Sequence, residues 1–271
     1  MPNPSIERTL AIMTAIPGYW DVGPHDPIPV EETWQDFVRH VGGQVVTDFL
    51  PEPRKFENAD FYFPELGVVA ELKEIETEFS KTPAFVAGFD ELMNRLVTEK
   101  PDWKPVMFGG SGEYPNWFVS EFIRIFRSPI SRILKKANRQ IRDTKSHLGI
   151  KEQTGLLLLV NDGFTSLEPH FVRTLACNLL SHSYSSIDCF LYLTVNRYVD
   201  VGSRTPSLLW VPTYSDRAPD SLVSFIDDLG RKWIDFLEQK IGPFTEKGEV
   251  PQSANLLHGA HAIVLLEPND G

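Results

Sequence analysis

The chain has 271 residues, of which 42% are hydrophobic and 23% are charged, and these values are typical of a globular protein. The hydrophobic content excludes an intrinsically disordered or collagen-like chain, and no apolar run approaches the ~18 residues that a membrane-spanning helix needs. The two cysteines, Cys177 and Cys189, cannot form a disulfide framework or a four-cysteine zinc site. We therefore expect reduced thiols in a cytoplasmic protein without a membrane partner.

Charge is distributed unevenly along the chain. The net charge is −11, from 26 basic and 37 acidic residues, which argues against non-specific nucleic-acid binding by the protein as a whole. Residues 124–151 depart from this average, because they contain nine lysines or arginines and one acid, Asp143. This window carries +8 and leaves −19 for the rest of the chain, so one segment could still bind a polyanion.

The first part of the chain predicts one helix followed by three strands. Residues 1–30 indicate a short helix and then a connection rich in proline and glycine. An apolar stripe that ends at two glycines predicts the next helix, and short apolar runs bounded by turn residues predict the strands. The helix covers 31–41 and the strands cover 44–50, 59–63 and 68–75, with a turn at 64–67 between the last two.

The remaining chain predicts long helices and buried strands. Thr82 followed by Pro83 is typical of an N-cap and a first helical residue. The continuous apolar run 155–160 is typical of a strand that is covered on both faces. The predicted helices cover 83–99, 117–126, 128–148, 168–181 and 220–241, and the predicted strands cover 155–160, 187–195, 207–214 and 262–266.

This order of elements predicts an α/β fold with a mixed central sheet flanked by helices. We assign residues 1–30 to the N-terminal helix and connection. Residues 31–271 form one α/β domain, with a helical insertion at about 77–128 after the strand 68–75.

The segment from residue 58 to residue 74 carries the chemistry. Asp60 lies on one predicted strand and Glu71 and Lys73 lie on the next, where alternation places them on the same face. The turn can bring Asp60 beside Glu71, and two carboxylates at one site are unfavourable unless a cation joins them. Oxygen ligands of this kind suit Mg²⁺ or Mn²⁺. A lysine beside them can hold a water or stabilise charge on a phosphate, as metal-assisted phosphodiester hydrolysis requires.

The spacing of Asp60, Glu71 and Lys73 resembles the motif of the PD-(D/E)xK nuclease superfamily, whose fold is restriction-endonuclease-like. Ala59 stands where the superfamily's name has Pro. The resemblance covers the order of elements over about 31–160, interrupted by 77–128. It implies that Asp60 and Glu71 bind the metal, with the main-chain carbonyl of Leu72 as a further ligand, and that Lys73 orients or activates the attacking water.

The resemblance also implies an acidic residue on the helix before the first strand. Glu31 borders the apolar stripe of the predicted helix 31–41 and is expected to face inward, whereas Glu32 is expected to face solvent. We therefore assign to Glu31 an assisting role towards the metal or the water.

The basic helix predicted over 128–148 has two faces. Its apolar residues share one side, and five cations share the opposite side. In the superfamily a helix at this position often presents a glutamine or a basic residue to the site or to the nucleic-acid backbone, and Gln140 is the candidate on the flank. The predicted nucleic-acid contacts are Gln140, Arg132, Lys135, Lys136, Arg139 and Arg142.

The sequence thus predicts a metal-dependent nuclease that uses Mg²⁺ or Mn²⁺ and acts on nucleic acid, with DNA favoured over RNA and a homodimer left open. One alternative is a non-catalytic nuclease-like module that binds nucleic acid or a protein partner. Another is an interaction protein that recruits partners through its acidic surface. A solvated hairpin with a salt bridge would also produce the motif. Against it, the strands around the charges are apolar, and charges inside a buried strand need partners.

Overall fold

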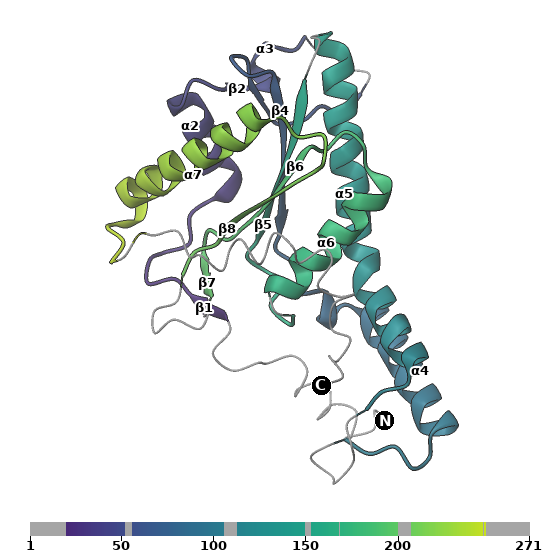
Figure 1. Ribbon diagram of the computed structural model, residues 1–271. Helices are drawn as coiled ribbons and strands as arrows, with labels where there is room; N and C mark the ends of the chain where they lie inside the picture. Colours follow the sequence, from purple (N-terminus) through teal and green to yellow (C-terminus); the bar gives the residue numbers. More distant parts are fainter. Residues whose placement is uncertain are drawn as a thin grey trace, which may run out of the picture.

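The computed structural model describes residues 20–51, 56–105, 113–149, 153–167, 169–199, 207–245 and 247. The helix predicted at the start of the chain and the strand predicted over 262–266 lie outside these residues. Figure 1 shows the arrangement of the described elements around one central sheet.

The central sheet has six strands in mixed orientation. They lie side by side in the order β2 (Gln44–Val45), β3 (Phe61–Phe63), β4 (Val68–Ile75), β5 (Thr154–Asn161), β6 (Cys189–Leu193) and β8 (Trp210–Tyr214). The three strands β4, β5 and β6 are parallel, and the outer pairs are antiparallel. β5 is buried along almost its whole length, as its apolar sequence predicts.

Helices cover both faces of the sheet. They are α2 (Val30–His40), α5 (Asn116–Leu148), α6 (Pro169–Ser183) and α7 (Asp220–Ile241). α2 and α7 lie on one face, and α5 and α6 lie on the other (Figure 1). The predicted α/β class, with a mixed sheet flanked by helices, is confirmed.

Side-chain alternation along β4 divides its residues between two cores. Val68, Ala70 and Leu72 pack in the core under α2 and α7. Val69 and Ile75 pack in the core under α5 and α6. The odd-numbered positions between them therefore face α5, and these positions include the two charged residues of the motif.

The core under α2 and α7 is held by aromatic side chains. Trp34 of α2 and Trp233 of α7 are both buried, and their rings stack with centroids 4.2 Å apart. Phe37 meets Trp233 edge-on at 5.0 Å. The predicted apolar stripe of the first helix is therefore buried against α7, and this packing fixes α2 beside the sheet.

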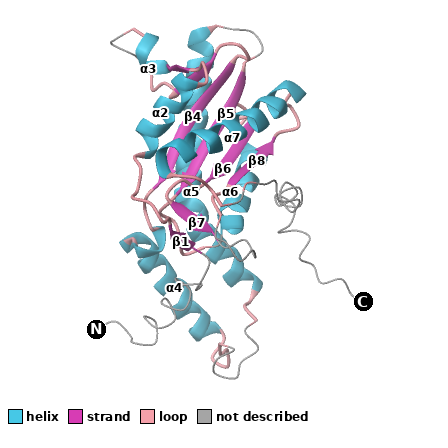
Figure 2. Ribbon diagram, turned by 90° about the vertical axis from the view of Figure 1, so that its left-hand side faces the viewer, coloured by secondary structure: helices cyan, strands magenta, loops and turns pink. Residues whose placement is uncertain are grey.

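α4 (Pro83–Glu99) and the first part of α5 form an arm that projects beyond the sheet (Figure 2). Thr82 caps α4 as predicted, because its side chain accepts a hydrogen bond from the backbone N–H of Phe85. The two helices pack through phenylalanine rings, with Phe85 against Phe126 at 4.7 Å. Before α4, the short 3-10 helix η1 (Phe79–Lys81) leads out of β4.

The strand predicted over 44–50 is wrong for most of its length. Only β2 is extended, and α3 (Val46–Phe49) follows as a single helical turn. Val46 and Leu50, four residues apart, are both buried in the core under α5, and the backbone N–H of Val46 bonds to the carbonyl of Asp60 at 2.8 Å. A helical turn satisfies this burial, because residues i and i+4 share a helix face.

The two helices predicted over 117–126 and 128–148 are one helix. α5 continues through Pro129, so the insertion predicted to end near residue 128 has no boundary there. A proline inside a helix costs about 3 kcal/mol. Phe126 and Ile130, on either side, are both buried, and burying each side chain contributes about 1.5–3 kcal/mol. Packing of the continuous helix therefore offsets the missing hydrogen bond.

Two short strands were not predicted. β1 (Trp20–Val22) and β7 (Arg197–Val199) pair antiparallel as a separate two-stranded sheet. Each strand has only three residues, which is too short for side-chain alternation to be recognised.

Candidate active site on the β3–β4 hairpin

The β3–β4 hairpin places Asp60 directly opposite Glu71. Phe61 pairs with Ala70, so the next pair outward in this antiparallel register is Asp60 with Glu71. The backbone N–H of Asp60 donates to the Ala70 carbonyl at 3.2 Å. Its carboxylate Oδ2 accepts from the backbone N–H of Leu72 at 2.8 Å. These two bonds direct the Asp60 carboxylate towards β4, as the predicted geometry requires.

Glu71 and Lys73 lie on the same face of β4, towards α5. Glu71 is fully buried, and Lys73 Nζ contacts its Oε1. The Lys73 side chain is one-fifth exposed, so the lysine lies between the buried carboxylate and solvent. The other Glu71 oxygen, Oε2, is buried and has no hydrogen-bond partner among the residues that the structure describes.

Both carboxyl groups have a raised pKa in this setting. Burial is the main cause that raises the pKa of Glu71 to about 8, and the neighbouring Asp60 raises it further. Burial also raises the pKa of Asp60, although the bond from the Leu72 N–H and the charge of Lys73 oppose this. Two acids that both resist ionisation form a site that favours a cation.

The main chain of Leu72 also faces this pair. The N–H and carbonyl of one strand residue point towards the same neighbouring strand. Because the Leu72 N–H donates to Asp60, the Leu72 carbonyl lies on the side of the hairpin where the Asp60 carboxylate lies. All three oxygen donors predicted for the metal therefore come from adjacent positions of one hairpin.

α5 holds the segment that leads into Asp60. Gln140 Nε2 donates to the Asn58 carbonyl at 2.9 Å, and the backbone N–H of Ala59 donates to Thr144 Oγ1 at 2.8 Å. Gln140 and Thr144 are one helical turn apart and so lie on the same face of α5. Two neighbouring peptide groups are thereby fixed to the helix immediately before the candidate site.

Gln140 is buried, in contrast to the predicted position on the helix flank for contact with nucleic acid. Its amide nitrogen is used by Asn58, and its Oε1 is buried with no hydrogen-bond partner in the described parts of the chain. Helix periodicity alone places Gln140 near the border of the apolar face, and the segment before β3 covers that border. Its observed contact is structural.

The structural role of Thr144 was not predicted. The sequence pattern places Thr144 within the apolar stripe of the helix, and the structure buries it completely. A hydroxyl inside a buried stripe needs a hydrogen-bond partner. The sequence could therefore have indicated that the Thr144 hydroxyl makes a hydrogen bond, although it does not identify Ala59 as the partner.

Glu31 is exposed, so the expectation that it faces inward is wrong. The buried stripe of α2 runs through Val30 and Trp34, and Glu31 lies one residue beyond its edge. Its charge nevertheless acts on the site, because it raises the pKa of Asp60 and of Glu74. Burial is the main cause that raises the pKa of Glu74 to about 7. Glu31 therefore adds negative potential without lying among the metal donors.

The five predicted cations of α5 are exposed, as the pattern of the helix predicts. Arg139 pairs with Glu57 at 2.6 Å, and Arg142 pairs with its neighbour Asp143 at 2.9 Å. The other three form no ion pair within the described residues; they are Arg132, Lys135 and Lys136. We call these five residues the basic face.

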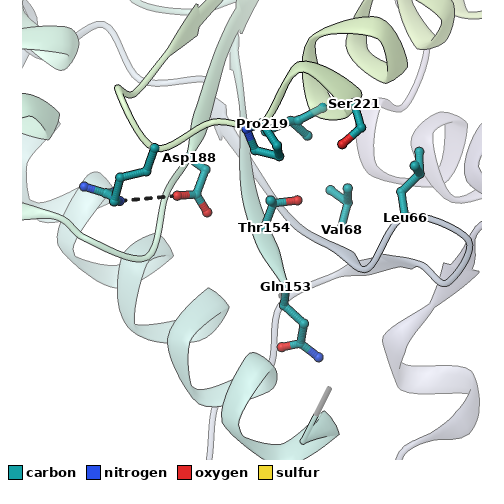
Figure 3. Close-up of a pocket in the computed structure, with 9 residues that line it drawn as sticks. Leu66, Val68, Gln153, Thr154, Asp188, Pro219 and Ser221 are labelled. Carbon is teal, nitrogen blue, oxygen red and sulfur yellow. Dashed lines mark ion pairs between the residues drawn. The ribbon is translucent and has the colours of Figure 1, made fainter. Parts of the chain in front are cut away.

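A pocket of about 440 Å³ lies at the other end of β4, where β4 and β5 begin (Figure 3). Asp188 and Arg217, 3.6 Å apart, form an ion pair on one side of it, and Ser221 at the start of α7 lies on another. None of the predicted site residues is among the described residues that line it. The pocket and the hairpin site are therefore separate features.

No group of three or more His, Cys, Asp or Glu residues gathers around a common metal position in the described parts of the chain. The hairpin supplies two carboxylates and a main-chain carbonyl instead. Both cysteines are free and buried. No helix of the described segments has the length and apolar character needed to cross a bilayer.

Comparison with protein-family models, with curated proteins and with solved structures found no match to this chain.

Proposed function

We propose that the protein is a metal-dependent nuclease with a restriction-endonuclease-like fold that hydrolyses phosphodiester bonds of nucleic acid, with DNA as the favoured substrate. The observation that carries this proposal is the opposition of Asp60 and Glu71 on one hairpin, with Lys73 in contact with Glu71. An ordinary surface hairpin would expose these charges, whereas here Glu71 is fully buried.

The donors fit a hard divalent cation such as Mg²⁺ or Mn²⁺. All of them are oxygens, burial raises the pKa of both acids, and Glu71 Oε2 lacks a partner in the described structure. Asp60, Glu71 and the Leu72 carbonyl would hold the ion. A bound ion supplies charge stabilisation and lowers the pKa of a coordinated water.

Lys73 has the second role in the proposed reaction. Its ammonium group lies at the exposed side of Glu71 and can donate hydrogen bonds to an attacking water or to a phosphate oxygen. The basic face of α5 would bind backbone phosphates on the same side of the sheet. Asp60, Glu71 and Lys73 thus act on the reacting phosphate, and the basic face of α5 positions the nucleic-acid strand.

A cleavage assay tests this proposal. Wild-type protein is incubated with single-stranded DNA, double-stranded DNA and RNA, in Mg²⁺ or Mn²⁺ and in a chelator. We expect metal-dependent cleavage that Lys73→Ala removes, while Lys100→Ala, an exposed lysine at the end of α4, leaves it unchanged. Equal activity of the wild type and Lys73→Ala would contradict the mechanism.

A non-catalytic binding module is the second candidate, and one observation favours it. Lys73 already contacts the buried Glu71 carboxylate, so the ion pair can be a complete structural contact without a metal. This candidate predicts binding of nucleic acid without cleavage of any substrate. Reversal of Arg132, Lys136 and Arg139 to Glu would then weaken binding and its salt dependence, since each lost phosphate contact lowers the salt slope by about 0.7–0.9.

A further inference from the structure

The carboxylate of Glu57 is bound by one cation, Arg139, and is influenced by the charges of two more. Arg139 Nη2 donates to Glu57 Oε2 at 2.6 Å. This bond is the main cause that lowers the pKa of Glu57, and Lys136 and Lys73 contribute through their charges. One exposed carboxylate therefore binds Arg139 directly and also feels the charges of Lys136 and Lys73.

The position of Glu57 is fixed by the contacts that α5 makes with the next two residues. The Asn58 carbonyl is bound by Gln140, and the Ala59 N–H is bound by Thr144. The Glu57 main chain is thereby anchored beside α5, whereas its side chain is half exposed, with 51% accessible against 52% for Arg139. Exposed ion pairs of this kind are weak and are readily exchanged for another anion.

We propose that Glu57 occupies a phosphate-binding position in the free protein, and that Lys73, Lys136 and Arg139 bind a nucleic-acid phosphate there once it displaces the carboxylate. The inference rests on the nucleic-acid binding in the proposed function and deepens it, because it places one phosphate beside Lys73. A phosphodiester presents two anionic oxygens, as a carboxylate does, and the planar guanidinium of arginine matches both.

The acidic residues on the α2 side of β4 support this placement. Glu74 feels the charges of Glu76, Asp162 and Glu31, all of which raise its pKa. A polyanion is repelled from that side and attracted to the α5 side. Glu57 is then an internal competitor at the point where the basic face reaches the site.

Glu57→Gln tests the proposal by removing the competitor and keeping the shape. Binding of a fluorescein-labelled 20-nucleotide DNA, single- and double-stranded, is measured by anisotropy in EDTA over a series of NaCl concentrations. We expect affinity to rise about two- to fivefold at low salt, the size expected for a lost exposed ion pair. The salt slope is expected to steepen by up to about 0.7–0.9, because the cation released from the phosphate is no longer balanced by a cation taken up by the displaced Glu57 carboxylate.

Asp48→Asn is the matched control. Asp48 pairs with Arg39 of α2 at 2.8 Å, with exposed fractions of 55% and 46%, so this change removes a similarly exposed carboxylate whose arginine partner lies on α2 and not on the basic face. Its affinity and salt slope are expected to match the wild type. An equal rise in both variants would overturn the inference, because net charge alone would then explain the change.

Unchanged or weaker binding by Glu57→Gln, or no binding by any variant, would also overturn it. Cleavage by the same variants in Mg²⁺ keeps the two proposals distinguishable. If the protein cleaves nucleic acid and Glu57→Gln binds with unchanged affinity, only the proposed phosphate position is overturned. Tighter binding without any cleavage supports the phosphate position and counts against the nuclease.

Discussion

Glu71 and Glu78 lie seven residues apart, yet their carboxylates have opposite surroundings. Glu78, just after β4, accepts hydrogen bonds from the N–H and hydroxyl groups of both Ser80 and Thr165 and from the N–H of Ser166. Glu71, inside β4, is contacted by one cation, Lys73, at one oxygen and lies beside a second acid, Asp60. The carboxylate of Glu78 accepts five hydrogen bonds, whereas that of Glu71 has far fewer donors around it.

The difference separates a structural acid from a candidate ligand. Three of the five donors around Glu78 come from Thr165 and Ser166 and join the end of β4 to the segment after β5, so its negative charge is fully used inside the fold. At Glu71 the fold has buried a carboxylate without supplying comparable donors, which costs free energy unless a cation or a proton compensates it. The first glutamate is expected to support stability, and the second to support activity.

The largest expected effect concerns cleavage. Glu71→Gln and Asp60→Asn each remove a metal ligand in the proposed site, and several kcal/mol of charge stabilisation would be lost with it. We expect the cleavage rate to fall at least about a thousandfold in each variant. Glu78→Gln, assayed at a temperature where it is folded, is expected to stay within a few-fold of the wild type. A comparable loss in Glu78→Gln would remove the distinction between the two acids.

The second effect concerns stability, where Glu78→Gln is expected to have the larger effect and Glu71→Gln the smaller. Glu78→Gln places an amide where five donors meet, so at least one donor loses its acceptor, and we expect the free energy of unfolding to fall by about 2–3 kcal/mol. Glu71→Gln replaces a buried carboxyl group that has few hydrogen-bond partners, so a smaller loss is expected. Urea denaturation of both variants measures the difference, and a larger loss for Glu71→Gln would break the comparison.

The third effect is the dependence of stability on pH. The pKa of Glu71 in the folded protein is about 8, above its ordinary value of 4.5, because of burial. The folded state therefore binds this proton more tightly, and the resulting stability is present at low pH and lost as pH rises to 8. We expect unfolding free energy to fall by on the order of 1–3 kcal/mol between pH 5 and pH 8.

Glu71→Gln is the control for this measurement. It cannot titrate at position 71, so its stability is expected to change less over the same pH range. A residual slope of the same sign is expected from Glu74, whose pKa is raised to about 7 mainly by burial. A wild-type stability that increases from pH 5 to pH 8 by more than the variant does would contradict the pKa assignment.

The smallest effect is stabilisation by a divalent cation. At ten times its dissociation constant, an ion that binds only the folded protein adds about 1.4 kcal/mol. We expect Mg²⁺ or Mn²⁺ at pH 8 to raise the melting temperature of the wild type and of Glu78→Gln, but not that of Glu71→Gln. An equal shift in Glu71→Gln would locate the bound ion elsewhere.

Much of the fold could be predicted from local patterns. The start of α4 follows from its capping residue, and the extent of α7 and the buried strand β5 follow from their apolar patterns. The motif residues were also expected to meet, because a short hairpin links neighbouring strands. The predictions that were wrong concern elements decided by tertiary packing. The chain forms the helical turn α3 at Val46, which buries this side chain under α5, and α5 continues through Pro129 because the side chains around it are buried.

The site was predictable only as far as the hairpin defines it. Asp60, Glu71 and Lys73 are placed by strand register, which the sequence pattern carries. The burial of Gln140 and the exposure of Glu31 depend on which other parts of the fold cover α5 and α2. The periodicity of a helix does not identify those parts. The contact between Arg139 and Glu57 joins positions 82 residues apart, beyond the range of any local pattern.

The proline inside α5 gives this helix a second possible start. Ser128 followed by Pro129 has the residue types of a favourable N-cap and first helical residue, at the point where the predicted helix 128–148 begins. The part of α5 that holds the segment before Asp60 lies wholly after this point, and the part that builds the arm lies before it. The arm can therefore lengthen, shorten or change its sequence during evolution while the portion beside the hairpin keeps its own capacity to begin as a helix.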